Sequence, residues 1–230
     1  MESPNIYNKG TRALIFDYGG TLDTGGRHWG RVLWQVWQQA KVPVSESAFR
    51  DAYVQAERML AVQPLIHPDT TFRQTLDTKL HLELRQVGCD DYRPQVLEIV
   101  YQQTMQHTAH SRAVLQQLAR RCPLVLVSNF YGNLHTVLHE FGFDGLFAHV
   151  VESAVVGVRK PDARIFQLGA EALGLQPAEV TVVGDSLAKD IIPARQAGCR
   201  TVWLCGQQWT DEPVDASVAD HVITDLKELL

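Results

Sequence analysis

The stretch ALIFDYGGTLDT, residues 13–24, joins a short apolar run to a cluster of glycine and acid. The carboxylate of Asp17 directly follows the apolar residues 13–16, and a glycine pair, Gly19 and Gly20, comes two residues later. Adjacent glycines mark a point where the backbone bends. The pattern therefore predicts a strand that ends at Asp17 and turns sharply after it.

Helical periodicity follows this strand. Apolar residues recur at intervals of three and four in residues 29–40 and 46–60, and two more helices are expected near residues 71–87 and 92–106. No strand pattern interrupts the region. We therefore expect a small helical bundle, an inserted cap, over residues 25–107.

From residue 111 onward, apolar strand-like runs alternate with amphipathic helices. The expected strands are PLVLV, AHVV, EVTVVG, RTVWLC and HVIT, and the expected helices cover residues 113–121, 134–141, 162–175 and 190–198. This alternation is typical of a parallel sheet with helices on both faces. We expect an α/β fold with a three-layer, Rossmann-like core, formed by residues 1–24 and 108–230 and interrupted by the α-helical cap.

Composition limits the classes of partner that the protein is expected to bind. A net charge of −5 over 230 residues argues against a nucleic-acid-binding face, although it is compatible with a small anionic substrate. The four cysteines form no C-x-x-C pair, so the sequence indicates neither a zinc site nor a disulfide framework. We find no leader-like N-terminus and no apolar run of membrane length, and expect a cytoplasmic protein without nucleic-acid or membrane partners. The oligomeric state is left open between monomer and homodimer.

Polar residues collect at the ends of the expected strands. Asp17 follows the first strand, Ser128 and Asn129 follow PLVLV, and Asp185 follows EVTVV, while Lys160 precedes the helix of residues 162–175. Open parallel sheets bind ligands beyond the carboxyl ends of their strands. We therefore expect these residues to converge on one pocket.

Each of these residues also has a simpler explanation. An aspartate or serine after a strand is commonly a turn residue or a helix N-cap. Lys160 resists this explanation, because a cation beside a helix N-terminus opposes the helix dipole and requires a partner anion. Pro161, expected at the first helical position, marks that terminus.

The segments FDYGGTLD, LVSN, GVRKPDARIF and VVGDSLAKDI resemble the four ordered motifs of the haloacid dehalogenase (HAD) superfamily of hydrolases. The helical segment between the first two motifs resembles the cap of that superfamily's phosphatases, phosphonatases and dehalogenases. The resemblance extends from residue 12 onward, and it is strong in the motifs and weak inside the cap. It implies a HAD-like core with an inserted helical cap.

The resemblance also implies a Mg²⁺-dependent phosphatase of a small phosphorylated metabolite. Asp17 would attack the phosphoryl group and form an aspartyl-phosphate, a role for which a carboxylate is chemically competent. Lys160 would neutralise charge on the phosphate and Ser128 would donate a hydrogen bond. The remaining expected contacts are Gly20, Thr21, Asn129 and His28 for substrate or phosphate, and Asp17, Gly19, Asp185 and Asp190 for the metal. Direct metal contact is favoured for Asp185 over Asp190, which could instead orient Lys160.

Gly19 departs from the family pattern. Phosphatases of the family typically carry a second aspartate at this position, which protonates the leaving group and then activates water. The carbonyl of Gly19 can still serve the metal, but no side chain can relay a proton. Loss of a positioned acid/base costs about 10²- to 10⁴-fold in rate, or roughly 3–5 kcal/mol of barrier. If this loss limits turnover, Gly19→Asp should speed hydrolysis of alkyl phosphates far more than of aryl phosphates.

Three candidates could replace the missing acid unless the leaving group needs little protonation. His28 is favoured over Arg27 because an unperturbed imidazole titrates near neutrality, although a histidine at the start of a helix is the simpler explanation. Asp23 is the other candidate, and its favoured role is to cap or stabilise the turn.

Other branches remain open alternatives. A dehalogenase would expel halide without a proton, but Asp185 and Asp190 argue against that metal-independent branch. A phosphonatase tolerates a small residue in the place of Gly19, but it needs a cap lysine that forms a Schiff base. Lys41 and Lys79 are the lysines of this cap, and Lys41 lies in an expected interhelical loop. A catalytically weak phosphate-binding or regulatory protein is the third alternative, and the presence of the Asp17 nucleophile argues against it.

Overall fold

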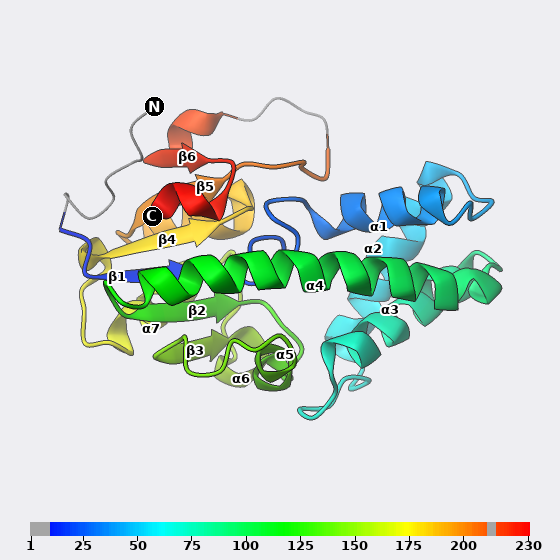
Figure 1. The fold of residues 1–230 in the computed structure, drawn as a ribbon, viewed down its shortest axis with the longest axis horizontal. Coiled ribbons are helices and arrows are strands. Elements are labelled where there is room, and N and C mark those ends of the chain that lie inside the picture. Colours follow the sequence, from blue (N-terminus) through cyan, green and yellow to red (C-terminus); the bar gives the residue numbers. More distant parts are fainter. Residues whose placement is uncertain (1–9, 211–214) are drawn as a thin grey trace.

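The structure is a computed structural model that describes residues 10–210 and 215–230 of the chain. It has an α/β core, and a group of helices lies beyond the carboxyl ends of the strands of that core (Figure 1). The expected fold class, a three-layer parallel-sheet core with HAD-like topology, is confirmed. Residues 1–9 of the expected core segment lie outside the described residues.

The core is built on six parallel strands in the order β3-β2-β1-β4-β5-β6. The central strand β1 pairs with β2 on one side and with β4 on the other, and Phe16 is level with Leu126 and Val183. The residues that directly follow β1, β2 and β4 therefore lie close together at the carboxyl ends of the strands. The strands are β1 (Ala13–Phe16), β2 (Leu124–Ser128), β3 (His149–Glu152), β4 (Val180–Gly184), β5 (Arg200–Leu204) and β6 (His221–Ile223).

Strand β1 is buried on both of its faces, which explains its unbroken apolar run. Leu14 and Phe16 pack into a cluster that includes residues of α4 (Arg93–Leu118) and α5 (Leu134–Glu140). Ala13 and Ile15 pack into a second cluster with residues of α7 (Arg164–Glu171) and α8 (Ile192–Gln196). All four side chains are fully buried, as is usual for a strand in the middle of a parallel sheet.

The cap consists of α1 (Trp29–Gln39), α2 (Glu46–Val62), α3 (Phe72–Gln86) and the first part of α4. Helical periodicity placed the first three correctly. Their starts have clear local causes, because Ser45 caps α2 and Thr71 forms a reciprocal capping box with Gln74 at α3. Trp37 and Phe49 pack edge to face in the cap interior.

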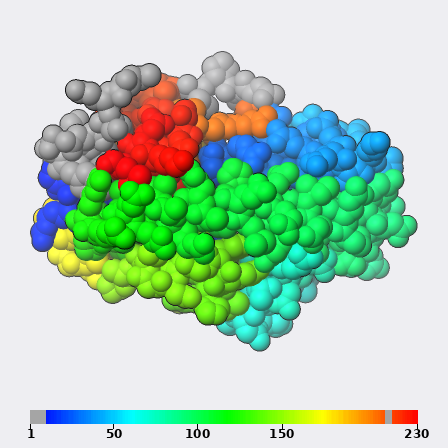
Figure 2. Space-filling view, in the orientation of Figure 1, coloured from blue at the N-terminus to red at the C-terminus, as the bar shows by residue number. Residues whose placement is uncertain are grey.

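The expectation of separate helices at residues 92–106 and 113–121 is wrong. Helix α4 runs without a break from the cap into the core, and its surface crosses the whole visible face of the molecule (Figures 1 and 2). The intervening residues contain neither glycine nor proline, and the buried hydroxyls of Thr108 and Ser111 donate to the carbonyls of Thr104 and Leu22. The expected cap–core boundary, between residues 107 and 108, thus falls inside one helix.

Candidate active site

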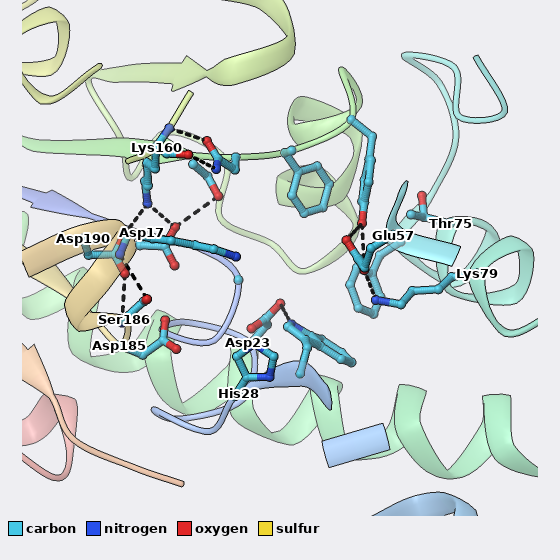
Figure 3. A pocket seen from close by; sticks show the side chains of 18 of the residues that line it. Asp17, Asp23, His28, Glu57, Thr75, Lys79, Lys160, Asp185, Ser186 and Asp190 are labelled. Carbon is cyan, nitrogen blue, oxygen red and sulfur yellow. Dashed lines mark hydrogen bonds and ion pairs between the residues drawn. The ribbon is translucent and has the colours of Figure 1, made fainter. Parts of the chain in front are cut away.

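Three carboxylates meet at the edge of the sheet (Figure 3). Asp17 directly follows β1, Asp185 directly follows β4, and Asp190 lies in the π-helical turn Leu187–Ile191 that comes next. One oxygen from each lies within 4.8 Å of the others, and all three side chains are buried. The structure therefore brings together the acids that the sequence predicted as neighbours.

The ammonium of Lys160 bridges two of these acids. Its Nζ donates to Asp17 Oδ1 at 2.5 Å and to Asp190 Oδ1 at 2.7 Å. Asn129 holds the main chain of Lys160 from both sides, since its Oδ1 accepts from the amide at 2.9 Å and its Nδ2 donates to the carbonyl at 3.0 Å. Asn129, expected to contact phosphate, thus uses its amide to position the lysine.

The expected helix start at Pro161 is wrong. Helix α7 begins at Arg164, and the Lys160–Pro161 peptide bond is cis. Lys160 therefore does not lie at a helix N-terminus, and the dipole argument for its partner anion fails. The anions are present nevertheless, and they are Asp17 and Asp190.

The hydroxyl groups of Ser128 and Thr21 also form hydrogen bonds with these carboxylates. Ser128 Oγ donates to Asp17 Oδ1 at 3.2 Å. Thr21 Oγ1 lies 3.2 Å from Asp17 Oδ2 and 3.1 Å from Asp185 Oδ1, and it accepts from the Asp185 amide. Thr21 is fully buried and contacts both carboxylates, so it holds them in a fixed position relative to each other.

The structure requires glycine at one of the two glycine positions of the first motif but not at the other. Gly20 has a φ of +100°, and a Cβ there would overlap the carboxylate of Asp185. Gly19 has no such constraint, because the nearest atom to a Cβ at this position would be Trp29 Nε1 at 3.9 Å. The backbone thus requires glycine at position 20, whereas position 19 has room for a side chain.

The site carries more negative than positive charge. Burial raises the pKa of Asp17 to about 6, with Lys160 opposing the shift and Asp190 adding to it. Burial, Asp190 and Asp17 raise the pKa of Asp185 well above its usual value. Burial disfavours the charged form of Lys160, but Asp17 and Asp190 outweigh it and raise its pKa. Three buried carboxyl groups around one ammonium fit a hard divalent cation, which prefers oxygen ligands and would supply the missing positive charge.

A cavity of about 210 Å³ separates these residues from the cap. Its core wall includes Asp17, Ser128 and Lys160, and its cap wall includes Tyr53, Glu57 and Lys79 (Figure 3). Its volume suits a small ligand.

Lys79, which the sequence offered only as a possible Schiff-base lysine of a phosphonatase, lines the cavity on the cap side. Its ammonium forms an ion pair with Glu57 and lies 4.3 Å from the ring centroid of Tyr53. Burial disfavours its charged form, but Glu57 and the neighbouring tyrosines raise its pKa well above the usual value. A signal was present in the sequence, because Lys79 falls beside Leu76 and Leu80 on the apolar stripe of α3.

His28 lines the same cavity, but its place favours the simpler explanation of a residue that begins a helix. Its Nδ1 accepts from the Gly30 amide at 3.0 Å as the N-cap of α1, and its ring stacks near Trp209. Burial, with Lys189 and Lys79 adding to it, lowers the pKa of His28 to about 4. The ring is therefore neutral at pH 7, which argues against a role as general acid.

Trp29 differs from Trp37 in where it packs. Both lie on the apolar stripe expected over residues 29–40, which favours the interior of the cap for each, and Trp37 is buried there. Trp29 instead lines the cavity, and its indole Nε1 donates to Asp23 Oδ2 at 3.0 Å.

Comparison with known proteins identifies the family of the chain. The family model "haloacid dehalogenase-like hydrolase" matches residues 11–198. Over 192 residues, the chain is 29% identical to the haloacid dehalogenase-like hydrolase domain-containing protein 3 of Bos taurus, which covers 80% of this chain and 76% of that protein.

Two named phosphatases match shorter segments. Identity is 38% over 88 residues to the glyceraldehyde 3-phosphate phosphatase of Pyrococcus furiosus, covering 38% of this chain and 37% of that protein. It is 40% over 83 residues to the phosphoserine phosphatase of Thermus thermophilus, covering 36% and 32%. The matched segments thus span about a third of the length of these two phosphatases.

Solved structures share the fold over nearly the whole chain. A dehalogenase crystallised as an intermediate complex superimposes with a TM-score of 0.64 at 22% identity and covers 96% of both chains. A HAD phosphatase from Thermococcus onnurineus gives a TM-score of 0.56 at 22% identity, covering 95% of this chain and 96% of that one. In the described parts of this chain, no helix is both long and apolar enough to cross a membrane.

Proposed function

Because the chain belongs to the haloacid dehalogenase-like hydrolases, we propose that it is a phosphatase that acts on a small phosphorylated metabolite through an aspartyl-phosphate on Asp17. One observation carries the proposal: Asp17 is exposed to a cavity while Lys160 and Ser128 hold one of its carboxylate oxygens. This arrangement presents a carboxylate nucleophile beside a positive charge, as phosphoryl transfer requires.

In the first half-reaction, an oxygen of Asp17 forms a bond to phosphorus while the bond to the leaving oxygen breaks. In the second, water attacks phosphorus, the acyl-phosphate bond breaks, and inorganic phosphate leaves. Lys160 lies where it neutralises charge on the transferring phosphoryl group, and Ser128 can donate a hydrogen bond to it. Gly20 allows the backbone of the loop to approach the phosphate closely.

Asp17, Asp185 and the carbonyl of Gly19 would be the ligands of Mg²⁺, and the carboxylate of Asp190 would add negative charge beside the ion. Bound there, the ion would neutralise charge on the phosphate oxygens. Asp190 already accepts from Lys160 and from the amide of Ser186, which supports the expectation that Asp185 is the better direct ligand.

The substrate is proposed to be a small phosphate ester. The named phosphatase relatives act on glyceraldehyde 3-phosphate and phosphoserine, and the cavity is small. Lys79 and Glu57 face the cavity from the cap, where N–H donors and carboxylate oxygens suit a polar leaving group. The cytoplasmic location and the monomeric or homodimeric state expected above stay proposals.

The phosphonatase alternative is less well supported. A Schiff base requires a neutral amine, whereas the ion pair with Glu57 and the raised pKa keep Lys79 protonated. The dehalogenase alternative is opposed by the three clustered carboxylates, since expulsion of halide needs no metal ion.

A panel of phosphate esters and anhydrides, assayed with Mg²⁺ and with a chelator, tests the proposal. We expect metal-dependent release of phosphate from at least one member, and loss of that activity by about 10³-fold or more in Asp17→Asn. Asp51→Asn, an exposed substitution on α2, is the matched control and should retain activity. No metal-dependent turnover of any member, including para-nitrophenyl phosphate and acetyl phosphate, would favour a binding protein. Halide release that is insensitive to chelation would favour a dehalogenase.

A further inference from the structure

Asp23 is a buried carboxyl group in the wall of the cavity that holds the proposed nucleophile. It lies six residues after Asp17 in the chain, and its Oδ2 accepts a hydrogen bond from the indole of Trp29. The proposed phosphatase lacks a proton relay at Gly19. Whether Asp23 could take over that role depends on its position relative to Gly19.

The indole nitrogen of Trp29 links the two positions. Trp29 Nε1 lies 3.9 Å from where a Cβ of residue 19 would stand, and it donates to Asp23 Oδ2 at 3.0 Å. The other oxygen, Asp23 Oδ1, accepts from the amide of Gly20 at 2.7 Å. The carboxyl group of Asp23 is thus anchored beside the space that a side chain at position 19 would enter.

The electrostatic setting suits a group that exchanges protons. Burial raises the pKa of Asp23 to about 7, and the carboxylate of Asp17 adds to the shift, while the hydrogen bonds from Gly20 and Trp29 oppose it. A carboxyl group that only stabilised the turn would need the Gly20 bond alone. The turn-stabilising role expected from the sequence does not explain why Asp23 also lines the cavity.

Three other ionisable side chains of the cavity, those of His28, Glu57 and Asp190, are already engaged. His28 is a neutral N-cap, and Glu57 is paired with Lys79 and accepts from the hydroxyl of Tyr131. Asp190 accepts from Lys160. Among the described residues that line the cavity, Asp23 is the carboxyl group nearest in the chain to Gly19 that accepts from no lysine or arginine, since its hydrogen bonds come from the Gly20 amide and the Trp29 indole.

We propose that Asp23 is the catalytic acid and base that replaces the side chain missing at Gly19. The inference rests on the phosphatase function proposed above. As the bond between phosphorus and the leaving oxygen breaks, the proton of Asp23 passes to that oxygen, and the product alcohol departs. The resulting carboxylate then takes a proton from the water that attacks the aspartyl-phosphate, which restores the starting state.

Asp23→Asn, compared on two kinds of ester, tests this role. With an alkyl phosphate, whose leaving group needs a proton, we expect kcat/KM to fall by about 10²- to 10⁴-fold. With para-nitrophenyl phosphate, phosphorylation of Asp17 needs no acid, so about one equivalent of nitrophenolate per enzyme should appear in a burst that is followed by slow turnover. A burst reports on chemistry, and a merely structural defect would weaken it together with the steady state.

Gly19→Asp supplies the matched rescue, since position 19 has room for a side chain. In the Asp23→Asn background it should restore alkyl phosphate hydrolysis by at least about tenfold. In the wild-type background it should not raise the ratio of alkyl to aryl phosphate hydrolysis, because a relay is already present. This single variant also tests the inference if Asp23→Asn does not fold, as judged by its melting temperature.

Two results would overturn the inference. Equal losses on alkyl and aryl esters without a burst would reduce Asp23 to a structural residue. An unchanged rate in Asp23→Asn, or a large gain specific to alkyl phosphates in Gly19→Asp alone, would mean that Asp23 supplies no relay. Absence of phosphatase activity in the wild-type protein would instead contradict the proposed function.

Discussion

At the scale of single residues, the cap contains a buried carboxyl group, that of Glu83. Glu83 lies on the apolar stripe of α3 and is fully buried, and in the described part of the chain neither of its carboxylate oxygens has a hydrogen-bond partner. The ammonium of Lys79 is 4.0 Å away and is already paired with Glu57. Burial raises the pKa of Glu83 to about 8, with Lys79 opposing the shift.

Glu83 should make the stability of the protein depend on pH. Its pKa is higher in the folded chain than in the unfolded chain, so the folded state retains a proton that the unfolded state loses. The free energy of unfolding should therefore fall as the pH rises from about 4.5 to about 8. Glu83→Gln removes this contribution, and its stability relative to the wild type should rise by at least about 1 kcal/mol between pH 5 and pH 9.

Urea unfolding of both proteins at the two pH values measures this difference. Glu46→Gln, on an exposed position of α2, is the control and should show a much smaller change. A stability difference between Glu83→Gln and the wild type that is the same at pH 5 and pH 9 would contradict the prediction.

At the scale of elements, α4 connects the cap rigidly to the core. The helix contributes Val96 and Val100 within the cap, and Val114 and Leu118 pack in the cluster that includes the face of the sheet. Because its backbone hydrogen bonds continue through residues 107–112, the helix cannot act as a loose linker. The position of the cap over Asp17 is therefore partly determined by one helix.

Ala109→Pro tests whether α4 is continuous. Ala109 is exposed in the middle of the helix, so a proline there should cost about 3 kcal/mol or more by removing a hydrogen bond and clashing with the preceding turn. Ala109→Gly should cost only about 1 kcal/mol. Thermal unfolding compares the two variants, and equal small losses would indicate a loop at this point.

At the scale of the whole molecule, the fold concentrates negative charge where the segments that follow β1 and β4 meet. Asp17, Asp185 and Asp190 repel one another in a buried site that Lys160 neutralises only in part. Binding of a cation should therefore stabilise the folded state. The stabilisation by a bound ion at 100 times its dissociation constant is about 2.7 kcal/mol.

Mg²⁺ should accordingly raise the melting temperature of the chelator-treated protein, by several degrees near saturation. Asp185→Asn should largely abolish this increase, because it removes a proposed ligand and part of the negative charge. Asp51→Asn is the control and should keep the full increase. An equal response of Asp185→Asn and the wild type would place the ion elsewhere.

Much of the site could be predicted from local sequence. Asp17, Ser128 and Asp185 each follow an apolar run, and parallel strands must bring such positions to one edge. Lys79 and Trp29 could not be placed in this way, because an apolar stripe does not distinguish the interior of a cap from the wall of a cavity. The start of α7 was missed because a proline marks a turn and a helix start equally well.

The sequence by itself determined the alternation of strands and helices and the order of the motifs, because these depend on short-range periodicity. Only the tertiary structure decided the continuity of α4, the pairing of Lys160 with Asp17 and Asp190, and the room left at Gly19. Lys160 lies 143 positions from Asp17 and 30 from Asp190, and Ser111 of α4 donates to Leu22, which is 89 positions away. The room at Gly19 comes from the absence of a neighbour, and neither kind of feature leaves a local pattern. The stretch of residues 13–24 thus pointed to Asp17 as the proposed nucleophile, and the packing of Trp29 pointed to Asp23 as its proposed partner.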